Sequence, residues 1–177
     1  MRSTSLDAFQ AMCHEYYTCF VFAAAGMEKF VQTFPLDPKR YPNQQIFIGN
    51  TPPNEGGAQS VMSASKAAEN AKRDGAFSDI LSKSLVVRIY AEWDERYRHD
   101  MADEFGVPAP QIRSDLMGDL RRVRHWIVHR KSVIDTDCTK IKVLPWKLAA
   151  GETLYLASVM FRELLNCIND MQVEIAA

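Results

Sequence analysis

The sequence has few cysteines, and none of them is arranged for metal binding or for a disulfide framework. The 4 cysteines among the 177 residues are Cys13, Cys19, Cys138 and Cys167, and no two of them form a CxxC pair. Thiols scattered through apolar helical patterns are typical of a reduced protein of the cytosol. We therefore expect a cytoplasmic location without disulfides.

Long apolar runs and excess charge are also missing. The longest apolar stretch, residues 19–27, is far shorter than a membrane-spanning helix requires. Residues 1–7 contain no apolar core followed by a small-residue cleavage site, so we expect neither a signal peptide nor a membrane segment. The net charge of -1 excludes a globally basic nucleic-acid coat but permits a local basic patch. The hydrophobic fraction of 47% indicates a globular chain.

Apolar residues repeat with the helical period over most of the chain. The spacing predicts helices over about 6–34, 60–74, 78–105, 114–130 and 152–173. In the strongest of them, Leu81, Leu85, Ile89, Trp93, Tyr97 and Met101 follow one another in steps of four. Only residues 44–48 and 141–144 look extended. We therefore predict an all-α bundle of four to five helices, formed by residues 1–177 as a single domain.

Residues 35–57 break this pattern. Five prolines, at positions 35, 38, 42, 52 and 53, remove backbone donors, and Gly49, Gly56 and Gly57 favour turns. We predict an irregular insertion after the first helix that covers part of the surface.

The helix predicted over 114–130 separates apolar from polar side chains. On a wheel, Leu116, Leu120, Val123 and Ile127 share the side that should face the core. The basic and histidine side chains lie roughly opposite, and Arg124 lies on the flank between the two sides. Trp126 points away from the core stripe, where it would pack against another helix, a partner chain or a base.

Residues 121–131, called the basic run, contain no acid. Their cations are Arg121, Arg122, Arg124, Arg130 and Lys131, and two histidines lie among them. A solvated helix normally mixes charges of both signs at a spacing of four residues. The run therefore indicates an anionic ligand such as phosphate, with a solvated basic face as the alternative.

A short motif within the basic run resembles a known family. Arg124-His125-Trp126-Ile127-Val128-His129 fits the arginine, four residues, histidine pattern of the HEPN superfamily, and residues 115–121 look like the approach to that motif. The resemblance covers residues 1–34 and 78–173. It implies a metal-independent endoribonuclease without cofactors, in which a ribose 2′-hydroxyl attacks the neighbouring phosphate.

The resemblance also implies roles and partners. His129 would be the general acid or base, and Arg124 would stabilise charge on the phosphate. His125 would transfer a second proton or orient its neighbours. Arg121, Arg122, Arg130 and Lys131 would bind RNA. We expect a homodimer with a shared basic cleft, a toxin, phage-defence or stress-response role, and a cognate antitoxin or defence-system partner.

Three other interpretations are open. His125 and His129 have the i, i+4 spacing of helical zinc ligands, but Trp126 stands where the HExxH motif has its glutamate. Glu92 or Asp94 could orient Arg124 or His129 from the preceding helix. Finally, the chain could be a non-catalytic HEPN-like domain that binds nucleotides or proteins.

Overall fold

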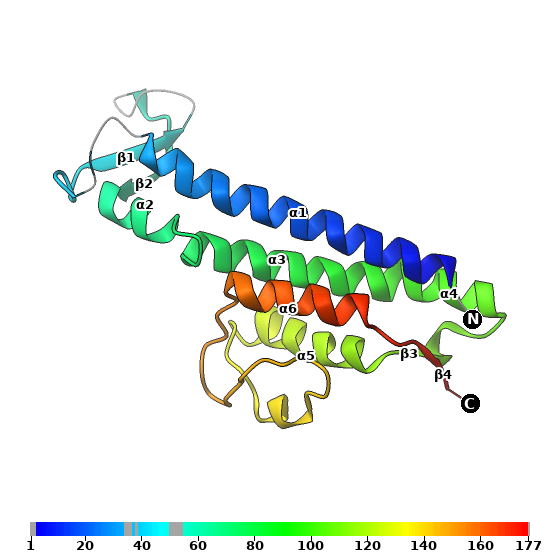
Figure 1. Cartoon of the computed structure of the whole chain (residues 1–177). Coiled ribbons are helices and arrows are strands. Elements are labelled where there is room, and N and C mark those ends of the chain that lie inside the picture. Colours follow the sequence, from blue (N-terminus) through cyan, green and yellow to red (C-terminus); the bar gives the residue numbers. More distant parts are fainter. Residues whose placement is uncertain (1–2, 34–36, 38, 50–54, 177) are drawn as a thin grey trace. The chain divides into compact units, whose positions relative to one another are not determined.

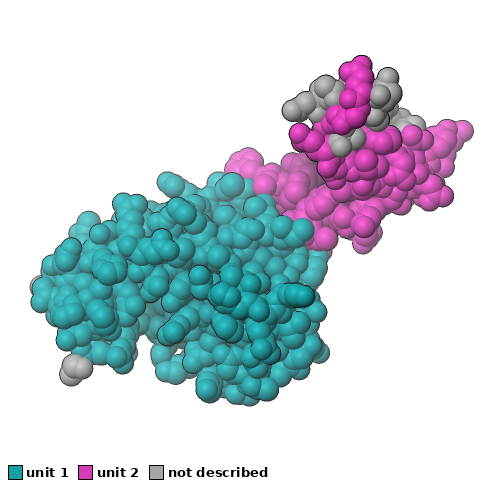
Figure 2. All heavy atoms as spheres, turned by 180° about the vertical axis from the view of Figure 1, so that it is seen from behind, with its two compact units in different colours: residues 1–20, 79–177 teal, residues 21–78 magenta. Residues whose placement is uncertain are grey.

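The chain divides into two compact units, which Figure 2 shows in different colours. Residues 1–20 and 79–177 form unit 1, and residues 21–78 form unit 2. The computed structural model describes residues 3–33, 37, 39–49 and 55–176. The first helix, α1 (Thr4–Gln32), contributes residues 4–20 to unit 1 and its remainder to unit 2.

In unit 1, the first part of α1 packs against a long helical rod. The rod consists of α3 (Ala76–Glu92), the π-helical turn η2 (Trp93–Tyr97) and α4 (Arg98–Phe105), in direct succession. The Phe9 ring of α1 meets the rings of Trp93 and Tyr97 edge-on, at centroid distances of 5.5 and 5.4 Å. The rod ends at Gly106, whose φ of 67° is left-handed and suits a residue without a Cβ. The helix predicted over 78–105 is thus confirmed, apart from the π-helical turn.

Two further helices complete unit 1: α5 (Asp115–His129) and α6 (Ser158–Asn169). Helix α6 packs on α1, because the Phe20 and Phe161 rings lie 5.0 Å apart and Gln10 Nε2 donates to the carbonyl of Ile168 at 2.9 Å. Figure 1 shows α5 and α6 running side by side along one side of the rod. Their buried side chains form the centre of the core, with Leu116, Leu120, Val123, Leu164 and Ile168 at most 2% exposed.

The prediction of an all-α bundle is wrong, because two small antiparallel sheets accompany the helices. In unit 2, β1 (Gln45–Gly49) pairs with β2 (Ala58–Ser63). In unit 1, β3 (Ile112–Arg113) pairs with β4 (Glu174–Ile175). Short helices lie at α2 (Ala64–Asn70), η3 (Ala109–Gln111) and η4 (Thr136–Lys140). The fold is therefore mixed, though mostly helical.

Strand pairing replaces the first part of the helix predicted over 60–74. Val61 lies opposite Phe47 in the β1–β2 ladder, and β-branched and aromatic residues suit such a pairing. Ser63 then begins α2, since its side chain accepts a hydrogen bond from the backbone N–H of Lys66. The helix therefore starts at Ala64, directly after this cap and four residues later than predicted.

The last helix begins at Ser158, whereas the apolar period predicted a start near residue 152. Residues 152–156 are not helical, and several of their backbone groups bond to other segments. Leu154 N–H donates to the carbonyl of Ser132 at 2.7 Å, and Leu156 N–H donates to the Asp79 carboxylate at 2.7 Å. These bonds satisfy donors that a helix would otherwise use.

The insertion predicted over 35–57 lies partly outside the described residues, which lack 34–36, 38 and 50–54. Its described part contains β1, so it is not irregular throughout. Among the residues that the structure describes, no helix has both the length and the apolar character needed to cross a membrane.

Candidate active site on helix α5

Helix α5 has nearly the predicted bounds and presents its two histidines to solvent as the wheel predicts, whereas Ile127, expected on the core face, is only half-buried. Its apolar face, which includes Leu116 and Val123, is buried against the rest of unit 1. Arg121, His125 and His129 are exposed, and Arg124 is half-buried. The sequence pattern therefore locates the polar face of α5 correctly.

His125 and His129 lie next to each other on the exposed face. Their ring centroids are 5.1 Å apart, and the ring planes are tilted by 41°. His129 is the last residue of α5. Histidine is the side chain that general acid–base catalysis uses most often, and here two of them lie side by side and exposed.

Left-handed backbone follows the histidine pair. Lys131 has a φ of 52° and Ser132 a φ of 66°, and neither residue is glycine. Ser132 N–H turns back to the Trp126 carbonyl at 2.9 Å and so closes the end of the helix. Lys131, a predicted RNA-binding residue, is exposed in this turn.

Arg124 points toward α3 and not along the histidine face. Its guanidinium carbon lies 5.8 Å from the centre of the Tyr90 ring. Both residues line a cavity of about 420 Å³, called the polar cavity, together with Arg121, Arg98, the two acids Asp94 and Glu95, and Ala91. Arg121 and Arg124 enter this cavity from α5, so the structure brings one candidate catalytic residue and one predicted RNA-binding residue together.

The charges in the polar cavity leave an excess of positive charge on α5. Arg98 donates to Asp94 Oδ1 at 3.3 Å and to the Ile112 carbonyl at 3.0 Å. Across the part of the chain that the structure describes, no salt bridge engages Arg121 or Arg124. Burial, followed by Asp94, raises the pKa of Tyr90, so its phenol remains protonated and able to donate.

Two predicted RNA-binding arginines are partly neutralised by the loop after α5. Arg122 donates to the Gly118 carbonyl at 2.9 Å and lies 3.8 Å from Asp137 Oδ2. Arg130 lies 3.4 Å from Asp135 Oδ2. The Thr136 N–H bond holds the pKa of Asp135 below its ordinary value, helped by Arg130 and His125. The basic run thus contains no acid in its sequence, but the loop over residues 135–137 places two acids, Asp135 and Asp137, next to it.

Trp126 belongs to the core, so the expectation that it points away from the core is wrong. Its side chain is fully buried, and its Nε1–H donates to Asp137 Oδ1 at 2.9 Å. A buried indole needs such an acceptor, and a loop eleven residues later in the chain supplies it. Trp126 is therefore not available to stack on a base.

Neither of the carboxylates suggested on the preceding helix bonds to the motif. Glu92 pairs with Arg88, and Asp94 pairs with Arg98. Among the described residues, no hydrogen bond or ion pair links Glu92 or Asp94 to Arg124 or His129. Asp94 does line the polar cavity, which places it near Arg124 without a direct bond.

Asp119 is a buried carboxylate whose role sequence reasoning missed. It is 1% exposed and accepts the backbone N–H groups of Lys142, Val143 and Leu144 at 2.7–3.1 Å. These bonds fix the segment predicted as a strand, residues 141–144, which forms no strand in the described structure. The signal was present in the sequence, because an acid at position 119 interrupts the stripe formed by Leu116, Leu120 and Val123.

The placement of possible ligands bears on metal binding at this site. Within the described part of the chain, no group of three or more His, Cys, Asp or Glu side chains is placed to hold a metal ion.

Comparison with protein-family models, with curated proteins and with solved structures gave no match. The HEPN resemblance therefore rests on the motif residues and their setting on α5.

Proposed function

We propose that this chain is a metal-independent endoribonuclease of the HEPN type. The observation that supports the proposal most is the exposed His125–His129 pair, with rings 5.1 Å apart, on the same helix as Arg121 and Arg124, which have no ion-pair partners among the described residues. Acid–base groups and unpaired guanidinium groups are what phosphodiester cleavage without a metal requires.

The proposed reaction transfers two protons and exchanges one bond at phosphorus. One imidazole takes the proton of the ribose 2′-hydroxyl, whose oxygen attacks the adjacent phosphorus. The bond from phosphorus to the 5′-oxygen breaks, and the other group returns a proton to that oxygen. The products are a 2′,3′-cyclic phosphate and a 5′-hydroxyl. DNA lacks the attacking hydroxyl, so it is not cut.

Each side chain has a distinct part in this mechanism. His129 is the first candidate for proton transfer, and His125 either transfers the second proton or orients its neighbours. Arg124 stabilises the negative charge that grows on the phosphate oxygens. Arg121 and Lys131 bind the RNA backbone, while Arg122 and Arg130 contribute less because Asp137 and Asp135 lie close to them.

The proposal also includes a homodimeric assembly and a biological role. A homodimer would bring two copies of α5 together and double the positive field at a shared cleft. The role would be that of a toxin or a phage-defence or stress-response nuclease, with an antitoxin or defence-system protein as a partner. The described cysteines are all free, which agrees with the reducing cytoplasm as its location.

A second function is favoured by the polar cavity. Its phenol and guanidinium groups could hold a nucleotide without any cleavage, in a site separate from the histidine pair. In that case Arg124→Ala would abolish nucleotide binding, and His129→Ala would leave it unchanged.

Incubation of the purified protein with total RNA in the presence of EDTA tests the proposal. We expect fragments with cyclic phosphate and 5′-hydroxyl ends, and no cutting of DNA of the same sequence. Activity that EDTA removes and magnesium restores would contradict the mechanism. Saturable nucleotide binding without cleavage would favour the second function.

A further inference from the structure

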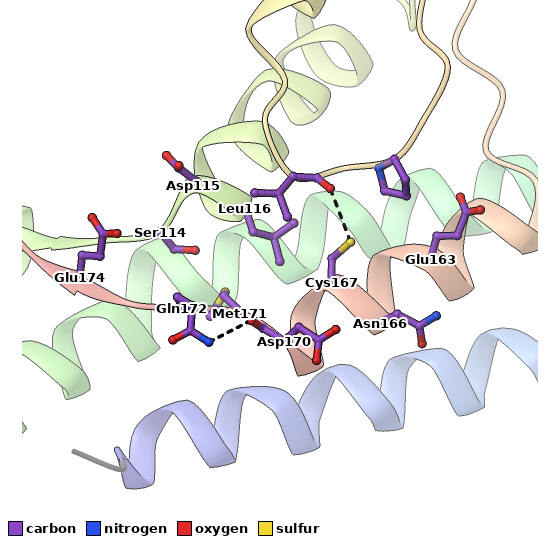
Figure 3. Close-up of a pocket in the computed structure, with 12 residues that line it drawn as sticks. Ser114, Asp115, Leu116, Glu163, Asn166, Cys167, Asp170, Met171, Gln172 and Glu174 are labelled. Carbon is purple, nitrogen blue, oxygen red and sulfur yellow. Dashed lines mark hydrogen bonds between the residues drawn. The ribbon is translucent and has the colours of Figure 1, made fainter.

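Unit 1 contains a second cavity, away from the motif residues and of opposite charge. It has a volume of about 490 Å³ and lies between the start of α5, residues 143–145 and one face of α6 (Figure 3). Its charged lining residues are Asp115, Glu163, Asp170 and Glu174, and no Lys, Arg or His lines it. We call it the acidic pocket. Its volume is within the range of small-molecule sites.

Most of the negative charge in the acidic pocket is not neutralised. Asp115 bonds to Lys142 Nζ at 2.6 Å, outside the lining. Over the residues that the structure describes, no salt bridge engages Glu163, Asp170 or Glu174. Burial raises the pKa of the Cys167 thiol, and Asp170 and Glu163 raise it further. The carboxylates of Asp170 and Glu163 thus act on the Cys167 thiol, which is part of the pocket wall.

The face of α6 sets the spacing of the pocket's acids. Glu163, Asn166, Cys167 and Asp170 follow the i, i+3, i+4, i+7 pattern, and all four line the pocket. Glu163 and Asp170 are seven residues apart, which separates them by about 10 Å along a helix axis. The lining also includes the apolar side chains of Leu116, Val143, Pro145 and Met171. A ligand therefore meets two separated acids and a partly apolar wall.

Ser114 supplies an independent sign of a missing polar partner. It lines the pocket, and its hydroxyl oxygen is buried and has no hydrogen-bond partner among the described residues. Ser114 occupies the N-cap position of α5, yet its side chain does not cap the helix. Figure 3 shows this side chain directed toward the middle of the lining residues. A rotation about its Cα–Cβ bond offers the hydroxyl to a bound donor, since an unmade buried hydrogen bond is costly.

The spread of the acids selects the class of cation. In the described part of the chain no three acids, histidines or cysteines converge on one point, so a bare metal ion would find too few ligands. Two separated acids in a pocket that also has an apolar wall instead match ammonium groups joined by methylene chains. We propose that the acidic pocket binds an aliphatic polyamine, with its ammonium groups at Glu163 and Asp170 and its methylene chain along the apolar wall.

Titration calorimetry of the RNA-free protein with spermidine tests this proposal. We expect saturable binding of one spermidine per chain. Glu163→Gln and Asp170→Asn should each weaken binding about tenfold or more, because each removes a charge-assisted hydrogen bond. Glu15→Gln is the matched control, since Glu15 is exposed on α1 outside the pocket and should leave the affinity unchanged. Circular dichroism verifies that the variants fold.

A second readout needs no variant. Cys167 lines the pocket, so bound spermidine should slow its alkylation by N-ethylmaleimide, while exposed Cys19 should react at an unchanged rate. Peptide mass spectrometry separates the two sites. The proposal is overturned if Cys167 is not protected, if Glu15→Gln weakens binding as much as Glu163→Gln does, or if magnesium chloride alone displaces spermidine as effectively as putrescine does.

Discussion

The histidine pair on α5 is the place where a single side chain should decide the chemistry. His129→Ala should lower RNA cleavage by about a hundredfold to ten-thousandfold, the usual effect of losing a positioned acid–base group. Arg124→Ala should be of similar severity. His125→Ala should be equally severe if that residue transfers a proton, and milder if it only orients. Gel analysis of a defined RNA measures each rate.

The control for this set is His99→Ala. His99 is an exposed histidine on α4, so its loss should leave cleavage unchanged. All four variants should retain the helicity of the parent, because none of these side chains is buried. If the His129→Ala variant cut RNA as fast as the parent, the nuclease proposal would fail.

Asp119 should matter for stability instead of chemistry. Asp119→Asn keeps the size but replaces one acceptor oxygen by an N–H group that faces the backbone donors of residues 142–144. We expect a loss of about 2–3 kcal/mol in the free energy of unfolding, since hydrogen bonds to buried charges are stronger than neutral ones. Urea unfolding measures it. Asp103→Asn, at an exposed position on α4, should change stability little.

The helical spacing of apolar residues predicts the long helices well. It does not predict the contacts that loops make with them. Residues 114–130 and 78–105 were predicted nearly as α5 and the rod occur, because their buried faces repeat every three or four residues. The β1–β2 pairing and the return of Asp137 to Trp126 depend on contacts across loops, which local spacing does not encode. The polar face of the candidate site was therefore predictable, while its partial neutralisation by residues 135–137 was not.

The end of α5 gives a prediction about backbone conformation. Lys131→Gly should raise the free energy of unfolding by about 0.5–1 kcal/mol, because glycine adopts a φ near 52° without a steric cost. Lys147→Gly should instead lower it, since Lys147 is not among the residues with positive φ. Urea unfolding compares the two variants. Destabilisation of equal size by both changes would contradict the assignment of strain to Lys131.

The junction between α2 and α3 is crowded at Gly75. A Cβ there would lie 2.4 Å from the carbonyl oxygen of Asn70 and 2.6 Å from that of Glu69, and neither backbone atom can move aside easily. We expect Gly75→Ala to destabilise unit 2 by about 1–3 kcal/mol. Gly26→Ala, toward the C-terminal end of α1, should stabilise the helix by about 0.5–1 kcal/mol, because a Cβ at that position meets nothing within 4 Å. Hydrogen exchange of residues 58–70 reports on unit 2 directly.

For the whole molecule, the prediction concerns its assembly into a homodimer. A shared active site requires two copies of α5 at or near one interface, so light scattering should give twice the chain mass of 20.1 kDa. Val128 lies on α5 between the two histidines of the motif and the arginines, on what we call the motif face, and is 48% exposed, which makes it an apolar contact that a partner copy could cover. Val128→Lys adds a like charge to a face that already carries Arg121 and the histidines. We expect this variant to dissociate the dimer and to lose cleavage together with it.

Val159→Lys is the matched control, because Val159 is 46% exposed on α6 and is not part of the motif face. It should leave the mass and the cleavage rate unchanged. A parent protein that is monomeric at high micromolar concentration would contradict the shared site. A dimer that survives Val128→Lys would place the interface elsewhere, and the two motif helices would then have to act independently. In that case, mixing inactive His129→Ala with inactive Arg124→Ala chains should restore no activity, whereas a shared cleft that combines residues of both copies predicts partial recovery.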